Sequence, residues 1–134
     1  MMFTVVSMVG LWLVIDWMIM GSRWAHRTVF SRISPALLTA SSLSSREQRA
    51  IMIRFSATTG ISAVSFALLG EWLGFPNVRI VESFVITAVL YVGLVAPPIL
   101  FHYFYFAVGR RFILLHLGTW ALKLLIGAAM FWAR

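Results

Sequence analysis

The chain has no cysteine and few acidic side chains: four Asp and Glu residues stand against eleven Lys and Arg among 134 residues. The absence of cysteine excludes disulfides, cysteine-ligated zinc and thiol catalysis. Polar sequence long enough for a soluble domain is also lacking, because four apolar stretches of about 20 residues use most of the length. No residue pattern typical of a catalytic site is present in the sequence, so we expect a protein that is not an enzyme.

Hydrophobic residues make up 61% of the chain, and they fall into four runs of the length that spans a bilayer. The predicted helices cover residues 1–20, 45–73, 82–109 and 112–132. Ser44 and Glu47 have the spacing of a capping box before the second helix, and Pro97-Pro98 predicts a distortion in the third. The sequence therefore predicts an all-α integral membrane bundle of four transmembrane helices, a single domain over residues 1–134, with an interfacial segment after the first helix.

The arginines lie mostly on alternate connections between the predicted helices. One side of the membrane would receive all of them except Arg79 and Arg134. Those expected to contact lipid headgroups are Arg23, Arg27, Arg32, Arg110 and Arg111. Because cytoplasmic loops carry the excess of basic residues, we expect a multi-pass inner-membrane protein with both termini outside the cytoplasm. Basic charge placed in this way contacts the lipid bilayer, so no nucleic-acid partner is predicted despite a net charge of +7.

Four ionisable side chains lie at positions of the predicted helices that are expected inside the bilayer rather than at its surfaces: Asp16, His102, His116 and Lys123. A charged side chain costs roughly 2.5 to 3.5 kcal/mol at the centre of a bilayer on insertion scales, so each of these residues needs a partner or a task. At about 1.5 Å per residue, Asp16 and Lys123 differ in depth by roughly 11 Å. We therefore expect a direct pair only if Lys123 bends toward the cytoplasm, and otherwise a bridging water.

Helical spacing groups these ionisable residues with aromatic side chains. Trp12 lies one turn before the aspartate, and Trp120 lies between the histidine and the lysine on one face of the last helix. A face of the third helix carries His102 beside the proline pair. If the three faces meet, we expect a polar pocket inside the bundle, with Trp12 and Trp120 in its walls.

The intramembrane polar cluster leaves several interpretations open. In the simplest, its members are structural and join the helices by hydrogen bonds and an ion pair. In a second, Asp16, His102, His116 and Lys123 move protons, ions or a small solute. In a third, His102 and His116 are axial ligands of a haem or chlorophyll-type ring, because histidine is the usual ligand. A metal site formed by Asp16 and the two histidines is not predicted, because such ligand types on three helices occur easily by chance.

Small side chains recur at helical spacing along one face of the second predicted helix. They are Ser56, Gly60, Ala63, Ala67 and Gly70. In lipid, small residues let another helix approach closely. We expect this face to pack against copies of the chain or against other membrane protein subunits. The leading functional prediction is therefore a non-enzymatic interaction or accessory subunit of a membrane complex or homo-oligomer.

The order of several motifs resembles a known family over nearly the whole chain. The motifs are Asp16-Trp17 with Gly21-Ser22-Arg23-Trp24, Ser44-Ser45-Arg46-Glu47, Val92-Gly93-Leu94-Val95-Ala96-Pro97, Phe112-Ile113-Leu114-Leu115-His116-Leu117-Gly118-Thr119-Trp120 and Gly127-Ala128-Ala129. In this order they resemble an uncharacterised family of small four-helix membrane proteins from bacteria and fungi, a domain of unknown function with the number seventeen sixty-one. The resemblance implies four helices and supplies no activity, and it assigns no role to Asp16 or Lys123.

Overall fold

The computed structural model describes residues 2–20, 22, 24, 45–106 and 109–132, with the backbone alone described at positions 20, 45, 47–52 and 102–106. Most of the interfacial segment predicted after the first helix lies outside the described residues, and so do Arg23, Arg27 and Arg32 within it. The remaining part of the chain contains the four predicted spans.

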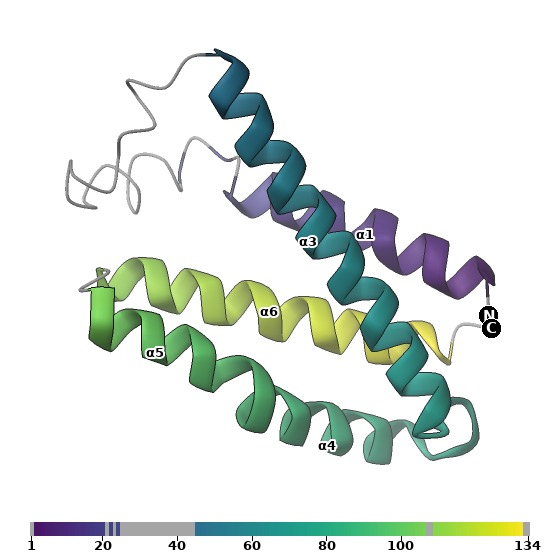
Figure 1. The fold of residues 1–134 in the computed structure, drawn as a ribbon. Coiled ribbons are helices and arrows are strands. Elements are labelled where there is room, and N and C mark those ends of the chain that lie inside the picture. Colours follow the sequence, from purple (N-terminus) through teal and green to yellow (C-terminus); the bar gives the residue numbers. More distant parts are fainter. Residues whose placement is uncertain (1, 21, 23, 25–44, 107–108, 133–134) are drawn as a thin grey trace.

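Four helices in the described chain are long and apolar enough to cross a membrane (Figure 1). They are α1 (Met2–Met20), α3 (Ser45–Trp72), a third rod made of α4 (Ile80–Leu90), η4 (Tyr91–Val95) and α5 (Ala96–Phe106), and α6 (Arg110–Met130). Large apolar side chains such as Phe3, Ile61 and Val92 are exposed on the surface of the bundle, as expected where lipid surrounds the helices. The predicted all-α fold with four transmembrane helices is confirmed, and the helix ends lie within a few residues of those predicted.

A tight turn joins α3 to α4. Gly74 has a φ of 74°, a left-handed conformation that side chains disfavour, and it ends the helix. The short helix η3 (Phe75–Asn77) follows and places Phe75 in the core with no exposed surface. At the start of α4, the backbone N–H of Arg79 donates to Oε2 of Glu82 at 3.0 Å, as in a capping box. The turn therefore reverses the chain so that α3 and α4 run in opposite directions.

The third rod departs from α-helical geometry near the proline pair. Pro97 and Pro98 lack backbone N–H donors, so carbonyls in the preceding turn lose their α-helical partners. That turn, Tyr91–Val95, is a π-helix, in which the N–H of Ala96 bonds to the carbonyl of Tyr91. The predicted distortion thus lies directly before the prolines, in the form of a widened turn.

The core at the end of the bundle away from Arg110 is an aromatic cluster formed by Trp12, Phe66, Phe75 and Phe131. Neighbouring ring centroids lie 5.7 Å apart for Trp12 and Phe66, 6.1 Å for Phe66 and Phe75, and 5.4 Å for Phe75 and Phe131. All four rings are buried, and tilted or edge-on contacts at these distances are favourable. The cluster ties together α1, α3, η3 and the end of α6, so the start of α1 and the end of α6 lie at the same end of the bundle (Figure 1).

The small-residue face of α3 packs inside the chain. Ala63 and Ala67 are buried, and a Cβ atom at Gly70 would overlap the ring of Phe131. A Cβ atom at Gly60 would meet a side chain of α1 at 4.0 Å. Close approach of helices is therefore what these residues provide, but the helices that approach are α1 and α6 of the same chain. Ala63, Ala67 and Gly70 are therefore occupied by contacts within the chain, whereas Ser56 and Gly60 are half-buried.

Gly127 and Gly118 provide a matched pair of positions on α6. A Cβ atom at Gly127 would lie 2.8 Å from Phe66 and 3.3 Å from Trp12, whereas one at Gly118 meets no described atom within 4 Å. We expect Gly127→Ala to destabilise the protein by about 1 to 3 kcal/mol, because the rings must move. We expect Gly118→Ala to be neutral or slightly stabilising. Thermal unfolding in mild detergent measures both, and equal stability of the two variants would contradict this packing.

Candidate functional site

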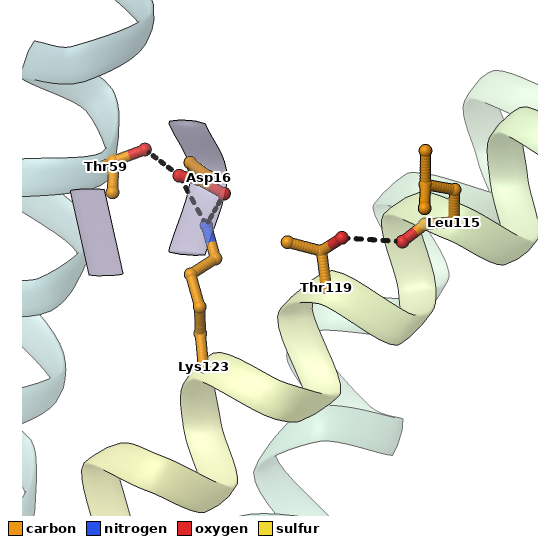
Figure 2. A network of polar contacts seen from close by, with 5 residues as sticks. All are labelled: Asp16, Thr59, Leu115, Thr119 and Lys123. Atoms are coloured by element: carbon orange, nitrogen blue, oxygen red, sulfur yellow. Dashed lines mark hydrogen bonds and ion pairs between the residues drawn. The ribbon is translucent and has the colours of Figure 1, made fainter. Parts of the chain in front are cut away.

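A buried ion pair joins the first and last helices. Nζ of Lys123 lies 2.8 Å from each carboxylate oxygen of Asp16, and the two side chains are only 3% and 1% exposed. The hydroxyl of Thr59 on α3 donates to Oδ2 of Asp16 at 2.6 Å, as Figure 2 shows. Side chains from three helices therefore meet at one carboxylate inside the membrane-spanning region.

The ion pair is direct, although the positions of its members along their helices predict a difference in depth. Side chains on a helix tilt toward the N-terminus of that helix. Because α1 and α6 run in opposite directions (Figure 1), Asp16 leans away from the arginine-bearing end of the bundle and Lys123 leans toward it. The two side chains converge, so Lys123 reaches the carboxylate and no bridging water is needed.

Two tryptophan rings lie beside the ammonium group. Nζ of Lys123 is 4.1 Å from the ring centroid of Trp120 and 5.7 Å from that of Trp12, within the range of cation–π attraction. The two indoles meet edge to face at 5.8 Å. Nε1 of Trp12 has no hydrogen-bond partner among the described residues. The contribution of Trp12 to the site therefore comes from its ring and its packing in the aromatic cluster.

A cavity of about 230 Å³ adjoins the ion pair. Its walls come from α1, α3 and α6 and consist of Asp16, Phe55, Thr58, Thr59, His116, Thr119, Trp120 and Lys123. Along α3 and α6, most of these residues lie between the ion pair and the helix starts, where Arg46, Arg110 and Arg111 are exposed. The cavity thus extends from the ion pair toward the arginine-bearing side, and the aromatic cluster fills the opposite side.

The structure brings together three of the four residues predicted to form a polar cluster. Asp16, His116 and Lys123 all line the cavity, and the ring of His116 stacks on Phe112 with the centroids 5.9 Å apart. The side chain of His102 lies outside the described residues, so its membership remains a prediction. The sequence predicted that the third side of the pocket would come from the third helix, residues 82–109. In the structure this side comes from α3, which is the second predicted helix.

The threonines of the cavity wall were not singled out by the sequence. Hydroxyl side chains are common in membrane spans and often bond to the carbonyl of the preceding turn, as Thr58 and Thr119 do. Thr59 differs, because its hydroxyl bonds to Asp16. A buried carboxylate needs such a donor from a neighbouring helix. Thr59 could be recognised as part of the site only once α1 is known to pack against α3.

The size and chemistry of the cavity restrict what it can hold. Pockets for drug-sized ligands measure roughly 300 to 1,000 Å³, so a haem or chlorophyll-type ring does not fit in the cavity beside His116. A ring held through His102 would involve a side chain beyond those described. The described residues contain no group of three His, Cys, Asp or Glu that could hold a metal ion. The polar groups that line the cavity are one carboxylate, one ammonium, one imidazole, one indole N–H and three hydroxyl groups.

Comparisons with known proteins add no relative. No family model, curated protein or solved structure matches the chain. The resemblance to the four-helix family stays a prediction. The ion pair and its cavity are therefore the basis on which function can be inferred.

Removal of one member of the ion pair should be more harmful than removal of both. Asp16→Asn leaves a buried ammonium without a counter-charge, and Lys123→Met leaves a buried carboxylate, so each should cost about 3 to 5 kcal/mol. The double variant is electrically neutral and should cost less than either single one. Thr59→Val removes one hydrogen bond and should cost about 1 kcal/mol. Unfolding in detergent measures the stability of all four variants. If the loss of stability in the double variant equals the sum of the losses in the two single variants, the pair is not coupled.

Proposed function

We propose that this four-span membrane protein moves protons, or a small ion coupled to protons, by means of the Asp16–Lys123 pair. The observation that carries the proposal is a buried ion pair inside the spans that borders a cavity. Well-packed apolar residues in place of a buried ion pair are often neutral or stabilising. Stability alone therefore gives no reason to keep two charges in the membrane, and ionisable residues there commonly mark proton or ion paths.

Proton uptake at Asp16 would change the net charge of the site. A protonated carboxylate no longer neutralises Lys123, and an ammonium group without a counter-charge is strongly disfavoured in a medium of low dielectric. Lys123 must then move or release its own proton. His116 lies on the cavity wall toward the arginine-bearing side, where an imidazole can pass protons near neutral pH. One proton entering from the cavity can in this way release another.

Passage to the other side requires a second arrangement of the helices. The aromatic cluster separates the ion pair from that side, because its rings are buried and in mutual contact. The π-helical turn Tyr91–Val95 is the irregular part of the third rod, and the hydroxyl of Tyr91 donates to the carbonyl of Leu117 on α6 at 2.9 Å. π-turns are frequent at functional sites in helices. We propose that the helices move at the contact between Tyr91 and Leu117 when the aromatic cluster opens.

The distribution of arginines orients the proposal in the cell. The exposed residues Arg46, Arg110 and Arg111 lie at the starts of α3 and α6, and Arg54 lies further along the first half of α3; basic residues favour the cytoplasmic side. The cavity would then open toward the cytoplasm, with both termini on the other side of an inner membrane. Cytoplasmic protons would reach Asp16 first.

Proton flux into liposomes tests this function. We expect wild-type protein to dissipate a pH gradient faster than empty liposomes and the neutral double variant Asp16→Asn with Lys123→Met to do so no faster than empty liposomes. The double variant is preferred to Asp16→Asn alone because it leaves no unpaired buried charge. Glu82→Gln is the matched control, since Glu82 is exposed at the start of α4. A wild-type protein without flux between about pH 5 and 8, the range in which histidine changes its charge, would remove the proposal.

A second candidate function is an accessory subunit of a membrane complex or homo-oligomer. Three residues of its predicted contact face on α3, Ala63, Ala67 and Gly70, are buried inside the chain, so we place the contact on another surface. The third rod offers a stripe on one face of α4 and η4: Val81, Val85, Val89 and Val92 are each at least 58% exposed and recur at helical spacing. A partner helix could cover this stripe, which faces lipid in a monomer. No catalytic step is assigned in either candidate.

Native mass spectrometry of gently solubilised protein tests the accessory role. If the valine stripe binds a partner, masses above the 15.1 kDa of one chain should appear, and Val89→Trp should reduce them because the larger ring prevents close packing. Ile61→Trp is the control, because Ile61 is 68% exposed on α3. Detection of monomers alone for the wild-type protein would argue against this candidate.

A further inference from the structure

The hydroxyl groups in the cavity wall can only accept hydrogen bonds from a ligand. Thr58 and Thr119 donate to backbone carbonyls four residues earlier at 2.9 and 2.8 Å, and Thr59 donates to Asp16 at 2.6 Å. A hydroxyl group has one hydrogen and two lone pairs. Because each hydrogen is already used, these residues offer a ligand only lone pairs.

The ammonium group of Lys123 also has partners within the protein. Its Nζ lies 2.8 Å from each carboxylate oxygen of Asp16 and 4.1 Å from the ring centroid of Trp120. The other nitrogen-bearing side chains in the wall, His116 and Trp120, supply fewer N–H groups than there are threonine and carboxylate acceptors. Acceptors therefore outnumber donors, which favours a ligand that brings its own N–H groups.

The site already surrounds one ammonium group, that of Lys123. A carboxylate neutralises it, and two indole rings lie within 6 Å of it, which is the combination that recognises ammonium ligands. Phe55 adds another ring to the cavity wall. A cavity of about 230 Å³ has room for a methylammonium ion and several waters, since a water occupies about 30 Å³ in the liquid.

We infer that the cavity binds a small cation with N–H donors, of the ammonium or methylammonium class, in exchange for the proton of Lys123. The inference rests on the proposed function, because the exchanged proton is one that the site moves. The ionisable groups that line the cavity are Asp16 from α1 and His116 and Lys123 from α6, and the lining residues of α3 are uncharged. The carboxylate is thus the group that must neutralise the incoming cation.

Charge balance explains the exchange. Two positive charges beside one carboxylate repel each other strongly in a medium of low dielectric. When the cation enters, Lys123 loses one proton to water in the cavity and becomes a neutral amine that still donates to Asp16. One positive charge enters and one leaves, so the charge of the site is unchanged. The same exchange in reverse expels the cation.

Proton release from the full chain in nanodiscs tests the inference. Methylammonium chloride is added to weakly buffered protein at neutral pH, and a pH-indicator dye records the protons released. Tetramethylammonium chloride at the same concentration is the matched probe, because it carries the same charge without N–H donors. We expect saturable release with methylammonium and none with tetramethylammonium. Release that is absent with both, or equal with both, overturns the inference.

Two variants locate the site. Lys123→Met should abolish the release, and release that persists in it would show that the proton comes from elsewhere. Because that variant leaves a buried carboxylate, Thr119→Val is the gentler test: it should raise the half-saturating methylammonium concentration about fivefold, the effect of one lost hydrogen bond. Thr87→Val is its control, since Thr87 is buried and bonds to the carbonyl of Ser83 at 2.7 Å on α4. An equal shift in both variants overturns the inference.

The proton-flux assay separates this inference from the proposed function. Flux without methylammonium-induced release overturns the inference and leaves proton movement intact. Release without flux supports the binding site and removes the transport role.

Discussion

The carboxylate of Asp16 is the point on which the arrangement of three helices depends. A charge inside a bilayer must be neutralised and hydrogen-bonded, and Asp16 obtains its counter-charge from Lys123 on α6 and a hydroxyl hydrogen from Thr59 on α3. Both partners can reach the carboxylate of Asp16 only if α1, α3 and α6 keep a defined register. Apolar contacts in lipid are less specific, because lipid chains are as apolar as the side chains. The ion pair thus specifies the register, and close packing around glycines holds it.

The bundle has two halves of different character along its length. Toward the arginine-bearing side, hydroxyl, imidazole and charged groups surround a cavity. Toward the other side, rings from Trp12 to Phe131 fill the interior. The ion pair lies at the boundary between these two halves, since Asp16 and Lys123 line the cavity and Nζ of Lys123 lies 5.7 Å from the ring centroid of Trp12. A group at such a boundary responds to the arrival of a proton or cation more strongly than one in water, which is why the proposals on function concern this position.

The helices and the ionisable residues of the site could be predicted from sequence, because length and hydrophobicity define membrane spans directly. The partners of those residues could not. Depth counted along each helix indicated a gap between Asp16 and Lys123, since it ignored the opposite tilt of side chains on antiparallel helices. The small residues of α3 predicted that a helix approaches closely, but spacing on one helix does not say which helix that is. Thr59 carries no signal of its own until the helix pairing is known.

The sequence separation of the ion pair has a consequence for synthesis. Asp16 and Lys123 are 107 positions apart, and a chain made from its N-terminus places the carboxylate in the membrane with the first helix and the ammonium with the last. Before α6 inserts, Asp16 has only the hydroxyl of Thr59 as a described partner. The carboxylate of Asp16 therefore obtains its counter-charge only when α6 inserts. A chain in which α6 has not inserted therefore carries a buried acid without its counter-charge.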